Sequence, residues 1–325
     1  MSSSMYFGVF SLVEGVMGIT LNAFIILTNM IGLRSGSKLT PPDIIHVVMG
    51  MVNISLRGLL LGHFLGIWLS ASYSIWFYVT ASPVPFLMYY TFWLTAWLCT
   101  YYCTSITTSN NGLFTWMKRC LPSSLPHLLV SSGLVSLVIS IPANWVLYVS
   151  FQGTSFGNGT FIITNVGIRS KSLVYIVMAN LLGCCLPFIL ILFSLITSVS
   201  SLLRHIRNMK KNNLESIRHK LQSHINAIRT MVMLLMLSGL FYTAESILFN
   251  IESMGDVKIV VSWWVIIMFP TSEAVIMIQA SQKLRKTFLG VFCPAKLMNG
   301  ITNLATLNLK LNPAGFNSDP DHIHL

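Results

Sequence analysis

Seven apolar runs, each long enough to cross a lipid bilayer, limit what this chain can fold into. A membrane-spanning helix needs about 20 mostly apolar residues, and seven stretches meet that requirement. Lipid offers no hydrogen-bond partner to a bare backbone, so each run is expected to be helical. We therefore predict an all-α membrane protein, a bundle of seven transmembrane helices. The predicted spans are Tyr6–Met30, Ile44–Leu69, Pro85–Ile106, Leu125–Val149, Leu173–Leu203, Met231–Asn250 and Ile259–Ala280.

The composition also indicates lipid surroundings. Of 325 residues, 54% are hydrophobic and 9% are charged, whereas soluble domains carry about 25% charged residues. The net charge of +11 does not indicate nucleic-acid binding, because the basic residues lie between apolar runs rather than on one polar face. Membrane lipids are expected as partners, and no nucleic acid is.

The sequence contains no pattern of catalytic or metal-binding residues. The six cysteines show no CxxC or His/Cys spacing, and most are expected to pack as small hydrophobic side chains. Ser-His-Asp and phosphate-loop patterns are missing as well. We therefore expect no metal, no cofactor and no enzymatic activity.

The Lys and Arg residues orient the predicted bundle. With the N-terminus outside, sixteen of the twenty fall in inner loops or in the tail, and positive residues collect on the cytoplasmic side. The largest group separates the spans that meet in the stretch Leu186–Leu237. This orientation places the sequon at Asn158 outside, where it can be glycosylated. Residues 1–285 are predicted as the seven-helix domain and residues 286–325 as a cytoplasmic C-terminal tail.

Motif residues follow one another in a fixed order along six of the seven predicted spans and the loops next to them. In span order the residues are Glu14, Gly18, Asn22, Phe24, Ile25, Asn29, Asp43, Arg57, Trp93, Leu94, Leu98, Tyr102, Ile106, Phe114, Lys118, Leu186, Pro187, Phe188, Ser201, Leu202, His205, Met209, His224, Ala227, Thr230, Pro270, Lys283, Leu284 and Arg285. In this arrangement the chain resembles the type 2 (bitter) taste receptors, which are G-protein-coupled receptors. Departures from the family pattern at Ser105, Glu273 and Ser281, together with a short third inner loop, identify it as a divergent member.

The resemblance implies a ligand cavity at the outer ends of spans three, six and seven. The matching residues are Met88, Phe92, Phe241, Glu245, Trp263 and Ile267. A cavity of aromatic and Met side chains with one carboxylate favours amphipathic, cationic small molecules. For any single residue of this set, packing against lipid or a neighbouring helix is an equal alternative.

The resemblance also implies a partner at the inner ends of spans three, five and six, a heterotrimeric, gustducin-like G protein. The residues at those ends are Ser105, His205, Met209, Lys210, His224 and Arg229. The chain is thus expected to be a multi-pass receptor of the plasma membrane, with bitter small molecules as agonists.

Arg57 predicts an intramembrane polar network. It lies near the middle of the second span, where a bare charge costs at least about 3 kcal/mol. Asn22, Asn53, backbone carbonyls and the carboxylate of Glu273 are the expected acceptors. Two interpretations stay open, a hub that rearranges on activation and a static packing network.

Two other functions are alternatives to the bitter receptor. One is a different chemosensory receptor, such as a pheromone type. The other is a transporter that uses Arg57, Glu14 and Glu273, but the sequence shows no repeated halves. A retinal-binding pump is excluded, because residues Ile259–Ala280 contain no Lys for a Schiff base.

Overall fold

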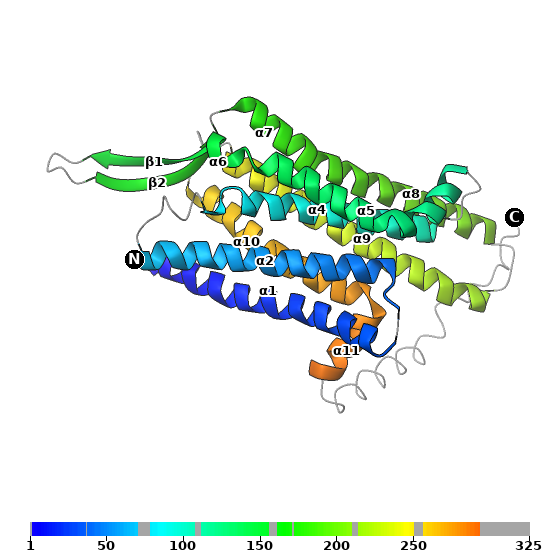
Figure 1. Ribbon diagram of the computed structural model, residues 1–325. Coiled ribbons are helices and arrows are strands. Elements are labelled where there is room, and N and C mark those ends of the chain that lie inside the picture. The colour runs from blue at the N-terminus through cyan, green and yellow to red at the C-terminus, as the bar shows by residue number, and fades with distance from the viewer. Residues whose placement is uncertain are drawn as a thin grey trace, which may run out of the picture. The chain divides into compact units, whose positions relative to one another are not determined.

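The chain divides into two compact units, Met1–Ala280 and Ser281–Leu325. The computed structural model describes residues 2–36, 38–70, 79–107, 112–155, 161–170, 172–209, 214–249 and 256–292. In the first unit the long helices run side by side as a bundle (Figure 1). In the second unit the described helix is α11 (Gln282–Phe292).

Seven long helical segments form the bundle within the described residues. They are α1 (Ser2–Arg34), α2 (Pro41–Ser70), α4 (Pro83–Ile106), α5 (Gly112–Ser140), the segment of α7 (Leu173–Ala179), η1 (Asn180–Cys185) and α8 (Leu186–Met209), then α9 (Leu214–Phe249) and α10 (Asp256–Ala280). In this part of the chain, six segments are long and apolar enough to cross a membrane by length and composition, and α4 is not among them. The predicted seven-helix bundle is confirmed.

The helix α4 lies at the centre of the bundle. It contacts α2, α5, α8 and α9, and fifteen of its 24 residues are buried. Because it faces protein more than lipid, it can hold the Trp, Tyr and Thr residues that lower its hydropathy. The hydroxyls of Thr91 and Thr100 each donate to a backbone carbonyl one turn earlier, which satisfies them inside the helix.

The fourth segment ends earlier than predicted, and a β-hairpin follows it. After α5 the chain turns at Pro142, which caps the short helix α6 (Ala143–Val146), and β1 (Leu147–Ser155) begins at once. The predicted end at Val149 was therefore wrong, because Pro142 interrupts the helix. β1 pairs antiparallel with β2 (Phe161–Ser170), from Leu147↔Ser170 to Ser155↔Phe161. This hairpin marks the end of the bundle at which α1 begins (Figure 1), called the hairpin end below.

A π-helical turn, η1, interrupts the fifth segment where it passes the central helix. Pro187 in α8 has no backbone N–H to donate to the preceding turn, and π-turns inside α-helices often mark functional sites. Gly183 permits a close approach here. A Cβ at this position would lie 2.6 to 2.9 Å from ring atoms of Tyr89, which is 1% exposed.

Replacing Gly183 by Ala is expected to destabilise the bundle by about 1–3 kcal/mol, the usual cost of overpacking a core. The ring of Tyr89 is 1% exposed, so it cannot move aside into solvent without losing its buried contacts. Thermal unfolding of the purified full chain in detergent measures the effect. Gly58→Ala is the matched control, because nothing lies within 4 Å of a Cβ there. Equal melting temperatures for both variants would contradict the close packing of η1 on α4.

Candidate functional site

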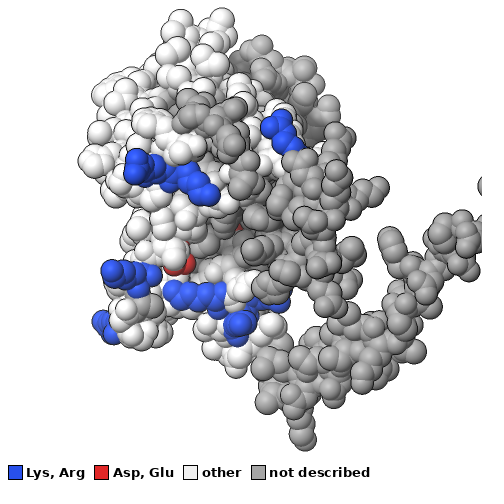
Figure 2. Space-filling model, turned by 90° about the vertical axis from the view of Figure 1, so that its right-hand side faces the viewer, with Lys and Arg blue, Asp and Glu red and all other residues white. Residues whose placement is uncertain are grey.

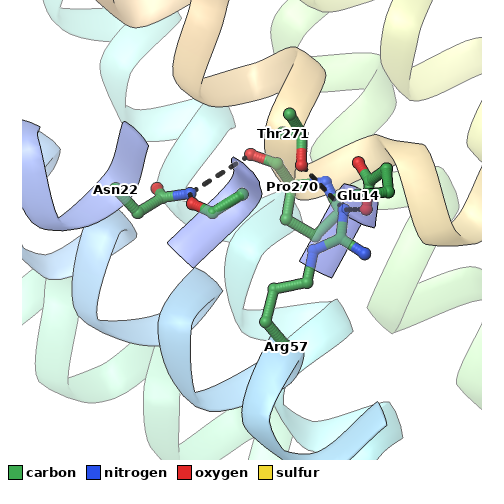
Figure 3. A network of polar contacts seen from close by, with 6 residues as sticks. Glu14, Asn22, Arg57, Pro270 and Thr271 are labelled. Carbon is green, nitrogen blue, oxygen red and sulfur yellow. Dashed lines mark hydrogen bonds and ion pairs between the residues drawn. The ribbon is translucent and has the colours of Figure 1, made fainter. Parts of the chain in front are cut away.

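A buried ion pair links α1 to α2 inside the bundle. The guanidinium of Arg57 lies 2.5 Å from the carboxylate of Glu14, and its Nη2 donates to the Thr271 hydroxyl of α10 at 2.8 Å (Figure 3). The exposed fractions of the three residues are 1%, 2% and 5%. The charge of Arg57 is thus compensated by an opposite charge and a neutral acceptor, as a charge inside a membrane requires.

A second group of polar contacts is centred on Glu273 of α10. Its Oε2 accepts from the Asn53 side-chain amide at 2.9 Å and its Oε1 accepts from the Thr95 hydroxyl at 2.7 Å. The Asn53 amide also donates to Asn22 Oδ1 at 3.3 Å. The four residues come from α1, α2, α4 and α10, and each is fully buried.

Gly18 joins the two groups on α1. Its carbonyl accepts from the Asn22 amide at 2.8 Å, and the same amide reaches the Pro270 carbonyl at 3.5 Å (Figure 3). A Cβ at Gly18 would lie 2.5 Å from the Thr271 hydroxyl oxygen and 3.0 Å from Arg57 Nε. Glycine is therefore required where the two groups meet, and together they are called the polar network below.

The structure brings Asn22 and Asn53 together as the sequence predicts, but it gives Arg57 other partners. The expected acceptors were Asn22, Asn53, backbone carbonyls and Glu273. The contacts of Arg57 go instead to Glu14 and Thr271. The physical reason is charge. Glu14 offers the full negative charge that an amide oxygen lacks, and the other carboxylate, Glu273, is held by Asn53 and Thr95 instead.

The six residues predicted for the ligand cavity lie in the half of the bundle near the hairpin end, on α4, α9 and α10. Phe92 and Phe241 are buried in edge contact, with ring centroids 5.1 Å apart. Both also contact Phe269, at 5.6 and 4.6 Å. Met88 and Ile267 are buried, whereas Trp263 is half-buried. The sequence does not single out Phe269, because the position of an apolar residue within an apolar helix does not indicate which way its side chain faces.

Glu245 lies one turn from Phe241 and forms a separate polar site. Its Oε2 accepts from the thiol of Cys184 on η1 at 3.0 Å, and the Tyr89 hydroxyl of α4 donates to the same carboxylate. Tyr175 of α7 is close enough for an electrostatic interaction with Glu245. These four residues, with exposed fractions of 6% or less except for 8% at Tyr175, are called the Glu245 site.

The residues predicted to face a G protein lie toward the opposite end. Ser105 is exposed in the last turn of α4, and Arg229 is exposed on α9. His205 and Met209 lie in the last two turns of α8, and His224 lies in α9. Lys210 falls outside the described residues, as does the sequon at Asn158.

Basic side chains surround this opposite end of the bundle. Figure 2 looks onto it and shows Lys and Arg in several places with little Asp or Glu. The described basic residues of the bundle toward this end are Arg34, Lys38, Lys118, Arg119, Arg204 and Arg229.

Comparison with known proteins assigns the chain to a family. Residues 1–296 match the family described as Taste receptor protein (TAS2R). The chain belongs to the taste receptor (TAS2R) family. It is 25% identical to taste receptor type 2 member 40 of Gallus gallus, over 70% of this chain and 75% of that protein. It is 26% identical to member 9 of Macaca mulatta, over 85% and 89%, and 27% identical to member 41 of Rattus norvegicus, over 84% and 90%.

Membership of the TAS2R family makes this chain a bitter taste receptor and a G-protein-coupled receptor. The predicted family is confirmed, and it is a family of receptors rather than enzymes. The helices place the chain among multi-pass membrane proteins. Within this TAS2R chain, Glu273 is built into the polar network through Asn53 and Thr95.

Arg57→Met is expected to destabilise this receptor by about 3–5 kcal/mol, because it leaves Glu14 buried without its counter-charge. The double variant Arg57→Met/Glu14→Gln removes both charges and is expected to recover much of the loss. A double-mutant cycle on thermal unfolding of the full chain measures the coupling. Purely additive losses would show that the ion pair contributes nothing beyond its separate side chains.

Proposed function

We propose that this receptor binds amphipathic, bitter small molecules between the hairpin-end halves of α4, α9 and α10. The residues of this agonist site are Met88, Phe92, Phe241, Glu245, Trp263 and Ile267. The carboxylate of Glu245 carries the proposal. Glu245 lies one helical turn from Phe241, whose ring packs against Phe92 and Phe269, and within the described residues no Lys, Arg or His pairs with its carboxylate. Such a carboxylate attracts a cationic group on an otherwise apolar ligand.

The second part of the proposal is the route from agonist to G protein. Two contacts at the Glu245 site cross from η1 to α9, Cys184 to Glu245 at 3.0 Å and Cys185 to the Tyr242 hydroxyl at 3.4 Å. A ligand at Glu245 therefore acts on the contact between the fifth and sixth segments. It favours a state in which α8 and α9 part at the end away from the hairpin, and this is a population shift.

The third part is orientation and partner. The basic side chains at the end away from the hairpin support a cytoplasmic location for that end. The N-terminus and the hairpin are then extracellular, with the protein in the plasma membrane and residues 286–325 as a cytoplasmic tail. A heterotrimeric, gustducin-like G protein docks near Ser105, His205, Met209, Lys210, His224 and Arg229. The same orientation puts Asn158 where it can be glycosylated.

Calcium imaging of cells that express the full chain with a promiscuous G protein tests the agonist site. Glu245→Gln is expected to raise the EC50 of cationic agonists about tenfold or more, since a charge-assisted contact contributes about 1.5–3 kcal/mol. Neutral agonists serve as the internal control and keep their potency. Unchanged potency for every cationic agonist removes Glu245 from the site, and silence across a broad bitter panel, despite verified surface expression, contradicts the proposed function.

Arg229→Gln tests the docking surface. It removes an exposed charge from α9 and is expected to lower the maximal response to every agonist while surface expression stays constant. Arg34→Gln is the matched control, because Arg34 is equally an exposed Arg toward the same end but lies on α1. Equal responses of the two variants would place the docking surface elsewhere.

A further inference from the structure

Among the described residues, the Glu245 site contains a buried hydroxyl without a partner. Tyr175 is 8% exposed, and its hydroxyl has no hydrogen bond among the described residues. It interacts electrostatically with both Glu245 and Tyr89. A buried polar group without a partner is costly, so its position next to a carboxylate points to a missing partner that both groups share.

The carboxylate of Glu245 also has unused acceptor capacity. Two carboxylate oxygens offer about four lone-pair positions, and the described donors to Glu245 are the Tyr89 hydroxyl and the Cys184 thiol. The thiol is a weak donor. A stronger, charged donor can therefore displace the thiol or occupy a free position beside it.

We infer that the Glu245 site recognises the N–H groups of a primary or secondary ammonium, with Glu245 and Tyr175 each accepting one hydrogen bond. This inference rests on the proposed agonist site and names the ligand class that the site takes. At least two N–H groups are needed to reach both acceptors. A quaternary ammonium carries the same charge but has none, so it is the disfavoured ligand.

The aromatic residues near Glu245 support recognition by hydrogen bonds rather than by a cation–π cage. A cage for quaternary ammonium presents open ring faces to the cation. Here Phe92, Phe241 and Phe269 pack on one another, with centroids 4.6 to 5.6 Å apart. The Tyr89 ring is covered by Gly183, since a Cβ there would lie 2.6 Å from it.

A series that differs in N–H count tests the inference on the full chain in calcium imaging. The probes are 2-phenylethylamine, its N-methyl, N,N-dimethyl and N,N,N-trimethyl derivatives, and neutral 2-phenylethanol. The amines carry a positive charge at neutral pH, so charge stays constant while N–H groups are removed. The EC50 is expected to rise along the series, by about tenfold or more from the primary to the quaternary compound.

Tyr175→Phe keeps the ring and removes the hydroxyl. It is expected to raise the EC50 of 2-phenylethylamine about tenfold and to leave the trimethyl compound and 2-phenylethanol unchanged. Tyr90→Phe is the matched control. Tyr90 follows Tyr89 on α4, but its ring lies against Gly133 of α5 and stacks on Phe86. Removing its hydroxyl is expected to leave the whole series unchanged.

The outcomes separate this inference from the proposed function. A trimethyl compound as potent as the primary amine overturns the inference, as does a Tyr175→Phe variant that weakens 2-phenylethanol equally. If none of the ammonium compounds gives a calcium response in cells that respond to other bitter compounds, the inference is overturned too, while the proposed function stands. Silence to every compound, with verified surface expression, contradicts both.

Discussion

The pairing of Arg57 with Glu14 is the interaction on which the interior of the bundle depends. A guanidinium that is 1% exposed inside a membrane-spanning helix must meet a negative charge, and Glu14 supplies it from the neighbouring helix. The contact with Thr271 then holds α10 against the same pair. Because Gly18 lets Arg57 and Thr271 lie against α1, the relative positions of α1, α2 and α10 follow from one compensated charge.

The three buried carboxylates of the described bundle have different surroundings, and so different roles. Glu14 faces a cation, and Glu273 accepts hydrogen bonds from an amide and a hydroxyl on two other helices. Both contacts hold helices together, one through a full counter-charge and the other through an amide and a hydroxyl donor. Glu245 accepts from a phenol and a weak thiol donor, next to a hydroxyl that has no partner within the described residues. Of the three carboxylates, Glu245 is therefore the one whose donor a charged ligand can most easily displace.

The sequence predicts the helices better than the contacts between them. Apolar length is a local property, so it predicts the segments well, although α4 is the least apolar of them and falls outside the six that meet the criterion for a membrane span. The ordered motifs gave the family. Which residue Arg57 would pair with depends on helix rotation, which no apolar run specifies. The β-branched and aromatic residues of Tyr148–Phe151 and Phe161–Thr164 are typical of strands. The predicted fourth span, however, already included the start of Tyr148–Phe151. Tyr89, Tyr175 and Cys184 carry no such signal.

The π-turn at Asn180–Cys185 bears on how this chain is aligned with its relatives. A π-turn takes up one residue more than an α-turn, so it corresponds to a single inserted residue in a helix of otherwise constant length. Against a relative whose fifth helix is a regular α-helix, a gapless alignment of this segment would displace every position on one side of the π-turn by about 100°, one residue of an α-helix. Ligand contacts transferred from such a relative to α7 would then be assigned to residues on the wrong face of the helix. A neighbouring residue that faces outward would be assigned the contact in place of Tyr175.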